Sequence, residues 1–274
     1  MLATALIVFR EILEAALVVS IILAATRGVP RRGTWVGIGL AAGAAGAGLI
    51  AVFAEAIANW AQGMGQELFN AGIMFLAVAM LAWHSIWMGR HGREMAQALG
   101  AVGKAVADGS RSLPGLAVVV GIALLREGAE AILFLYGIAV GEPGQPGSMI
   151  IGALLGATGG VAVGATLYLG LLQIPTHRLF SVTNALVIVL AAGMASQGVG
   201  YLISAGWLPS WGEGIWDSSW LLSERSVPGK MLHALVGYTD RPAGIQVAVY
   251  LATLLSITLL MRRLGKPALA KRQG

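Results

Sequence analysis

One short motif places charged residues inside stretches that are otherwise apolar. The pattern is R-E-x-x-E, and it occurs twice, at residues 10–14 and 126–130. In a helix, residues three and four positions apart share one face, so the arginine and both glutamates of each motif point into the same sector. Carboxylate oxygens bind hard cations and also carry protons. The two motifs therefore indicate chemistry on a cation or a proton within an apolar environment.

The energetic cost of these charges argues against an incidental role. An ionised side chain at mid-membrane costs roughly 2.5–3.5 kcal/mol, so six without compensation would cost on the order of 15 kcal/mol. Internal ion pairs that fix helix packing explain half of the observation, because two arginines neutralise two glutamates. The two surplus carboxyls are either protonated by burial or bound to a cation. At this point a cation pathway, a proton pathway and a structural ion pair all remain open.

The elements that must position these motifs are membrane spans. The chain of 274 residues is 57% hydrophobic and 11% charged, with a mean hydropathy of +0.78. Soluble domains carry roughly 25% charged residues, and an apolar helix of about 20 residues crosses a bilayer. We expect an all-α polytopic membrane protein with seven transmembrane helices, at 2–26, 34–58, 69–89, 113–140, 148–173, 179–206 and 244–262.

The basic residues predict the orientation of these spans. Most of the 18 lysines and arginines follow the first, third, fifth and seventh spans, and the intervening loops are richer in acids. Cytoplasmic loops carry the excess of basic residues, so the N-terminus is expected outside and the C-terminus in the cytoplasm. We expect a multi-pass protein of the cytoplasmic (inner) membrane. This distribution of charge favours the lipid bilayer over nucleic acid as the partner of the basic residues.

The first three spans resemble the next three. The segment "FREILEAALVV" at 9–19 aligns with "LREGAEAILFL" at 125–135, an offset of 116, and Phe69 aligns with Phe180, an offset of 111. Glycines of the second and fifth spans align at an offset of 113: Gly39, Gly43 and Gly46 with Gly152, Gly156 and Gly159. Because each copy has three spans, the second is inverted, as in many secondary transporters whose sites lie between the repeats.

This repeat divides the chain into three parts. Residues 1–112 form the first three-helix repeat and include a cytoplasmic segment, 91–112, that we expect to be a short amphipathic surface helix. Residues 113–206 form the inverted second repeat. Residues 207–274 comprise a Trp-rich external segment, the seventh helix and a basic cytoplasmic tail. The architecture is thus a 3+3 inverted repeat with one additional span.

At these residues the chain resembles the high-affinity iron permeases of fungi and bacteria, the oxidase-dependent iron transporter family. The resemblance covers nearly the whole chain and includes the external segment "WDSSWLLSERSVPGKMLHALVGYTDRPAG" at 216–244. It implies inward transport of iron, Fe²⁺ or Fe³⁺, as a substrate and not as a permanently bound cofactor. It further implies an external or periplasmic iron oxidase or iron-binding protein as a partner. The ion's ligands would be the four motif glutamates, supported by Arg10 and Arg126: Glu11, Glu14, Glu127 and Glu130.

Several other residues could take part. Acidic residues near the external ends of the spans could draw cations towards an entrance, although solvated loop acids have the same composition: Glu55, Glu67, Asp217 and Glu224. His84, within the third span, could be a secondary ligand or a packed core histidine. No feature of the sequence indicates an oligomeric state.

Two other functions are compatible with parts of this sequence. A proton-coupled carrier of another divalent cation could use the same carboxylates. A membrane-embedded oxidoreductase is disfavoured, because bis-histidine haem needs histidine pairs within the spans and only His84 lies in one. The chain has no cysteine, no H-E-x-x-H and no nucleotide-binding motif. We therefore expect a transporter and not an enzyme.

Overall fold

The structure, a computed structural model, is all-helical over the part of the chain that it describes, residues 1–61, 65–141, 146–170, 176–212, 214–224 and 226–264. The end of the predicted fifth span (171–173) and the basic tail (265–274) lie outside these residues. The helices are α1 (Leu2–Ala25), α2 (Arg32–Ala61), α3 (Gln66–Ala107), α4 (Pro114–Gly141), α5 (Pro146–Tyr168), α6 (Thr176–Ser204), α7 (Val227–Val236) and α8 (Gly244–Leu264). The expected all-α class is confirmed.

Five of these helices, α2, α3, α5, α6 and α8, contain an apolar stretch long enough to cross a membrane. Helices α1 and α4 have the length, 24 and 28 residues, but each carries the three charged residues of an R-E-x-x-E motif in its middle. Helices α2, α5 and α8 expose large apolar side chains, including Phe53, Leu154 and Leu255. Such surfaces need lipid around them, so the chain is an integral membrane protein.

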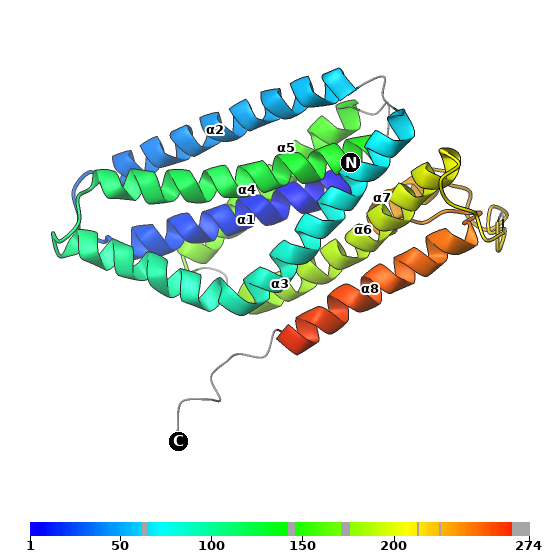
Figure 1. Ribbon diagram of the computed structural model, residues 1–274. Helices are drawn as coiled ribbons and strands as arrows, with labels where there is room; N and C mark the ends of the chain where they lie inside the picture. The colour runs from blue at the N-terminus through cyan, green and yellow to red at the C-terminus, as the bar shows by residue number, and fades with distance from the viewer. Residues whose placement is uncertain (62–64, 142–145, 171–175, 213, 225, 265–274) are drawn as a thin grey trace.

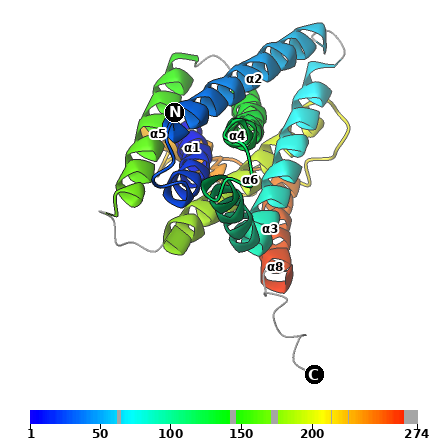
Figure 2. The same cartoon turned by 90° about the vertical axis from the view of Figure 1, so that its left-hand side faces the viewer.

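The helices that carry the motifs are each covered by a glycine-rich neighbour. Helix α2 packs along α4, and α5 packs along α1 (Figures 1 and 2). A Cβ at Gly39 would lie 2.6 Å from the carbonyl oxygen of Ala117, and one at Gly156 would overlap that of Ala5. Only glycine allows backbones to approach this closely. Each motif-bearing helix is therefore covered by a neighbour that is distant from it in the sequence.

Helices α3 and α6 complete the bundle. They pack against each other, and α8 lies along α6 (Figure 1). The membrane-crossing stretch of α6 is 61% buried, whereas that of α8 is 17% buried, so α6 is central and α8 peripheral. Their shared core includes Met74, Leu81 and Phe134, each almost fully buried. The α4 residues of this core, Phe134 and Ile138, lie about one and two helical turns beyond the second motif.

The prediction of a separate amphipathic helix over 91–112 is wrong. Helix α3 continues to Ala107, and Figure 1 shows that its second half turns away from the first. Gly89 and Gly92 lie near the middle of the helix, and glycine is a common site of helix bending. The apolar face of the second half is covered by protein, because Leu99 and Val106 pack with α1 and α2. The apolar face of residues 91–107 is therefore buried against protein and does not lie on the membrane surface as a separate helix.

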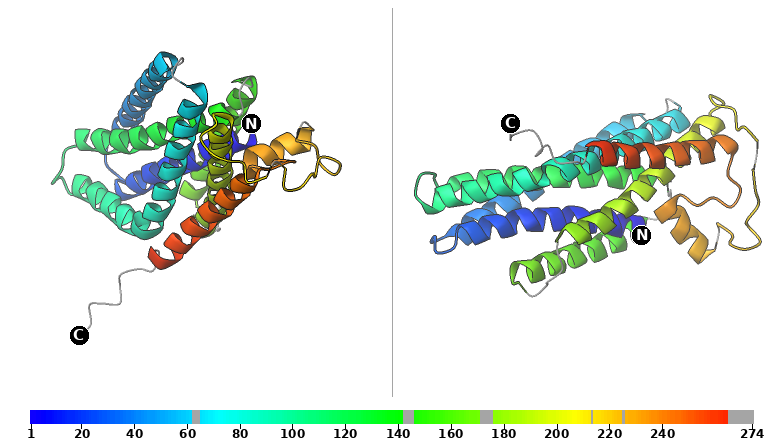
Figure 3. Two further views of the ribbon diagram at one scale, coloured as in Figure 1. Left: turned by 45° about the vertical axis from the view of Figure 1, so that its right-hand side comes forward. Right: turned by 90° about the horizontal axis from the view of Figure 1, so that it is seen from below.

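The segment between α6 and α8 lies at the end of the bundle where the chain starts (Figure 3). It contains α7, which contacts both α6 and the start of α1. Its tryptophans are largely exposed, with Trp207 at 70% and Trp220 at 83%. Exposed indole rings at one end of a membrane bundle are typical of the lipid–water interface. Helix α8 ends towards the opposite end of the bundle.

Candidate metal site at the crossing of α1 and α4

The first motif is completely enclosed. Arg10 and Glu11 are each 3% exposed and Glu14 is 5% exposed, deep in a helix whose neighbours cover it on all sides. The guanidinium Nε of Arg10 lies 3.1 Å from Glu14 Oε1, and its NH1 lies 3.6 Å from Glu11 Oε1. One arginine thus faces two carboxylates. It holds Glu14 closely and Glu11 only at a distance.

The second motif is more open. Arg126 lies against Glu127, with Nε and NH2 donating to Oε1 at 3.0 and 2.5 Å, and its Nε is 3.8 Å from Glu130 Oε1. The arginine side chain is 38% exposed, while Glu127 is buried and Glu130 is 14% exposed. The guanidinium also lies 5.4 Å from the ring centroid of Trp87 on α3, a cation–π contact. Trp87 is a contributor that the sequence analysis missed.

His84 joins the two motifs. It projects from α3, and its Nε2 lies 3.2 Å from Glu14 Oε2. Its Nδ1 pairs with Glu130 Oε2 on α4. Both ring nitrogens therefore face carboxylates, one from each motif-bearing helix. These contacts place His84 within the group of charged side chains.

Four side chains form a group that could hold a metal ion. Glu11, His84, Glu127 and Glu130 each offer one ligand atom, and these four atoms lie within 4.8 Å of one another. Both carboxylate oxygens of Glu11 and Oε2 of Glu127 are buried without a hydrogen-bond partner. A buried polar atom without a partner is costly, and a bound cation would satisfy these three. The arrangement is thus suited to a cation with carboxylate and imidazole ligands.

Glu14 lies at the edge of this group. Its carboxylate already has Arg10 on one side and His84 on the other. Glu14 therefore contacts both Arg10 and His84. Three of the four predicted glutamates lie together with His84. The fourth, Glu14, contacts the group through His84.

Comparison with known proteins decides what kind of molecule this is. Residues 1–266 match the iron permease FTR1 family. The chain belongs to that family. The resemblance drawn from the R-E-x-x-E motifs is thereby confirmed, and the family is one of permeases and not enzymes.

Individual relatives agree with the family match. The permease is 30% identical over 264 residues to the ferrous iron permease EfeU of Yersinia pestis, with 93% of this chain and 91% of the relative covered. It is 32% identical over 274 residues to EfeU of Escherichia coli O6:H1, with 96% and 97% covered. EfeU of Shigella sonnei is 32% identical over 252 residues, covering 89% of each chain. No solved structure matches the permease.

The acidic residues considered for an entrance do not join the central group. Glu55, near the end of α2, and Glu67, in the first turn of α3, are both exposed. Asp217 and Glu224 lie in the segment before α7 and have different partners. Asp217 pairs with Arg241 at 2.8 Å, and Glu224 pairs with His233 at 3.2 Å.

Asp217 belongs to a polar turn outside the membrane spans. Its Oδ1 accepts hydrogen bonds from the hydroxyl and the backbone N–H of Ser219, at 2.5 and 2.9 Å. These bonds, together with the Arg241 guanidinium, lower the pKa of Asp217 to about 2. The carboxylate is ionised and fully engaged at neutral pH, which favours a structural role over ion collection.

Proposed function

We propose that this permease moves iron, as Fe²⁺ or Fe³⁺, inward across the cytoplasmic membrane through the group formed by the two motifs and His84. The observation that carries the proposal is the convergence of Glu11, His84, Glu127 and Glu130, whose ligand atoms lie within 4.8 Å inside a membrane bundle. Carboxylates and imidazole both ligate iron. Glu14 completes the proposed ligand set when the ion moves between the two helices.

The charge of the group supports a cation as its occupant. The two motifs contain two arginines and four glutamates, a net charge of −2 when all are ionised. A divalent ion would neutralise that charge, and a buried net charge is otherwise strongly unfavourable. The arginines reduce the field that the ion experiences. We propose that this weakens binding enough to permit release.

The inverted repeat is part of the proposal. The partners of Gly39 and Gly43 on α4 and those of Gly152 and Gly156 on α1 keep the same offset of 116 that relates the motifs. Each motif-bearing helix is therefore covered by the second helix of the other repeat. This packing supports a site between two inverted halves, the arrangement of secondary transporters. The proposed parts are 1–112, 113–206 and 207–274, with seven spans.

The proposed orientation follows the same logic. With seven spans and an external N-terminus, the segment 207–243 lies outside, at the end of the bundle where α1 begins (Figure 3). The arginines that end α8, Arg262 and Arg263, then lie in the cytoplasm. Iron would enter from the side of segment 207–243. An external or periplasmic oxidase or iron-binding protein would dock there.

Uptake of radioactive iron into proteoliposomes tests this function. Wild type, Glu14→Ala and Glu130→Ala are supplied with Fe²⁺ under reducing conditions or with ferric citrate, and Glu94→Gln on the exposed part of α3 serves as the matched control. We expect uptake by wild type and the control, and none by the two motif variants. The salt that is taken up identifies the oxidation state. Uptake that survives both motif substitutions would refute the site, and uptake of manganese or zinc in preference to iron would refute the substrate.

A further inference from the structure

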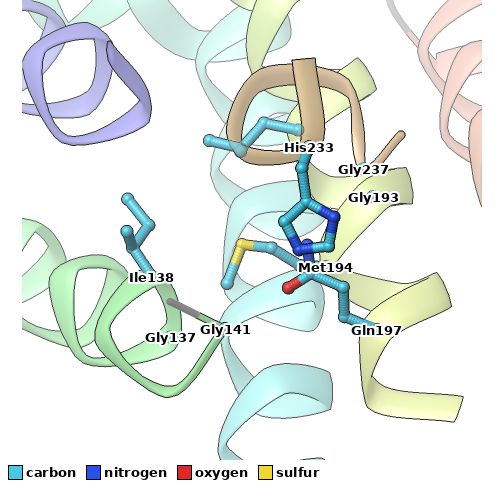
Figure 4. Close-up of a pocket in the computed structure, with 9 residues that line it drawn as sticks. Gly137, Ile138, Gly141, Gly193, Met194, Gln197, His233 and Gly237 are labelled. Atoms are coloured by element: carbon cyan, nitrogen blue, oxygen red, sulfur yellow. The ribbon is translucent and has the colours of Figure 1, made fainter. Parts of the chain in front are cut away.

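A second group of side chains that could bind a metal lines a small pocket between α4, α6 and α7. Figure 4 shows the imidazole of His233 projecting from α7 into this pocket, beside Met194 and Gln197 of α6. Gly137 and Gly141 of α4 form the opposite wall. Because these glycines have no side chains, the polar atoms of α6 and α7 remain uncovered on that side.

The hydrogen bonds of His233 fix which ring nitrogen faces the pocket. Its Nδ1–H donates to the carbonyl oxygen of Tyr238 at 2.8 Å, and the carboxylate of Glu224 lies 3.2 Å from the same nitrogen. A carbonyl oxygen can only accept, so the proton is assigned to Nδ1. The Nε2 atom then accepts a hydrogen bond from the amide Nε2 of Gln197, 3.2 Å away. Metal-binding histidines are held in this way, with one nitrogen bonded to a carboxylate or carbonyl and the other directed at the ion. Here an ion at Nε2 would replace the hydrogen bond from the Gln197 amide.

Helix α7 is built to hold this ring in place. Ser226 caps its first turn by accepting from the N–H of Gly229 at 3.1 Å, and Gly237 ends it with a left-handed φ of 71°. A Cβ at Gly193 on α6 would lie 2.8 Å from the Cα of Gly237. Two glycines thus let the end of α7 rest directly on α6. His233 is the residue whose carbonyl accepts from the Gly237 N–H, so its position is set by this contact.

The other side chains of the pocket are softer metal ligands than the carboxylates of the central group. Met194, which is 3% exposed, offers a thioether, and a Cβ at Gly137 would overlap its methyl group. A Cβ at Gly141 would overlap Oε1 of Gln197, so that oxygen is directed at the α4 wall. Imidazole and thioether favour Fe²⁺ over the harder Fe³⁺.

We propose that His233 Nε2, Met194 Sδ and Gln197 Oε1 form an outer site that binds Fe²⁺ before it reaches the central group. Glu224 is a positioning residue that keeps the proton on Nδ1. The inference rests on the proposed function, since it concerns the ion that the permease takes up. It deepens that function by naming ferrous iron as the form selected.

The location of the pocket suits this role. Gly137 lies seven residues beyond Glu130 on α4, which is about 10 Å along a helix. The pocket is lined by His233 and Gly237, so it lies at the end of the bundle that carries segment 207–243. An ion leaving the pocket would therefore follow α4 to reach the carboxylates.

Anaerobic titration of the purified full-length permease with Fe²⁺ tests the outer site. The parent protein carries Glu127→Gln, so that the central group is disabled and the outer site is observed alone. We expect one Fe²⁺ to bind, His233→Ala to abolish that binding, and Met194→Leu, which preserves volume, to weaken it. Loss of the positioning carboxylate in Glu224→Gln should raise Kd by ~10-fold or more. Lys230→Ala, on the exposed face of α7, is the matched control.

The overturning results are equally specific. If His233→Ala and Met194→Leu bind Fe²⁺ as the parent does, the outer site does not exist. If ferric citrate binds as tightly as Fe²⁺, the selection of ferrous iron is wrong. Met194→Leu keeps the test valid if His233→Ala does not fold. A failure of the proposed function is distinguishable, because wild-type liposomes would then take up no iron, whereas failure of the outer site leaves wild-type uptake intact.

Discussion

The two R-E-x-x-E motifs are alike in sequence and unlike in surroundings. Arg10 is 3% exposed and faces two carboxylates, whereas Arg126 is 38% exposed and rests against Trp87. Glu11 has no hydrogen-bond partner for either oxygen, whereas Glu127 accepts two hydrogen bonds from Arg126. The same five-residue pattern therefore provides a tightly enclosed ion pair in one helix and a more accessible one in the other.

The difference arises from α3, whose two aromatic side chains at the site have no counterpart in α6. At the offset of 111 between α3 and α6, His84 and Trp87 correspond to Ala195 and Gly198. The imidazole of His84, which joins Glu14 to Glu130, and the indole of Trp87, which contacts Arg126, therefore have no equivalent in α6. The duplicated motif supplies two sets of carboxylates, and single residues of α3 make the site asymmetric. An ion in this group would therefore have different surroundings on the α1 side and on the α4 side.

The most severe test of the comparison is to remove one carboxylate from each motif. Glu11→Gln and Glu127→Gln keep the size of the side chain and remove its charge. We expect iron uptake into proteoliposomes to fall to the background of empty liposomes in both, because each supplies an unpartnered oxygen to the central group. Retained uptake in either variant would show that only the other motif carries the ion.

The two arginines should differ in their effect on stability. Arg10→Gln leaves two buried carboxylates without their cation and should destabilise the fold by about 3–5 kcal/mol. Arg126→Gln should cost about 1 kcal/mol or less, because the guanidinium is partly solvated. Unfolding in detergent at a fixed pH measures both. Equal losses would mean that the difference in burial has no energetic consequence.

Replacing His84 by alanine makes α3 resemble α6 at the equivalent position. The variant removes the bridge between Glu14 and Glu130, and we expect uptake to fall ~10–100-fold without loss of the fold. Uptake and thermal unfolding are measured on the same preparation. Wild-type uptake would show that the asymmetry at this position is irrelevant to transport.

Trp87→Leu sharpens the comparison around Arg126. It removes the cation–π contact while keeping an apolar side chain, and we expect a loss of about 0.5–1 kcal/mol in unfolding free energy. In an Arg126→Gln background the same substitution should cost less, since the cation is already absent. A double-mutant cycle with no coupling would contradict the contact.

Asp217→Asn should have the smallest effect, because the carboxylate is half exposed and remote from both motifs. Its pKa is lowered to about 2 in the fold, so the stabilisation that it contributes is present above its ordinary pKa of 3.8 and is lost as the pH falls through about 2. We expect a small decrease in Tm at pH 6 that diminishes towards pH 3. Iron uptake at pH 7 should equal that of wild type, and a marked loss would restore Asp217 as part of the entrance.

The sequence predicted the motif residues because intramembrane charge is a strong local signal. It could not rank His84 above a packed core histidine, because the partners of His84 lie 70 residues before and 46 residues after it in the chain. The methionines around it, Met80 and Met88, have the spacing of an ordinary core face. Only tertiary structure reveals that its two nitrogens meet two different motifs.

The remaining differences have similar causes. The continuation of α3 to Ala107 was missed because the charged residues after Met88 suggested the end of a span, although helix formation is not limited by the membrane. His233 was not singled out at all. The sequence does carry a local signal for α7, because Ser226 and Gly237 cap its two ends. The pocket around His233, however, depends on glycines of α4 and α6 that are distant in sequence.

The central claim, that iron occupies the group joining the two motifs, is tested most directly by locating the ion. Crystals of the permease grown anaerobically with Fe²⁺ would be measured on both sides of the iron absorption edge. We predict an anomalous peak within bonding distance of the carboxylates of Glu11, Glu127 and Glu130, and its loss in Glu127→Gln. Iron bound elsewhere in the bundle, with no peak among these carboxylates, would contradict the account.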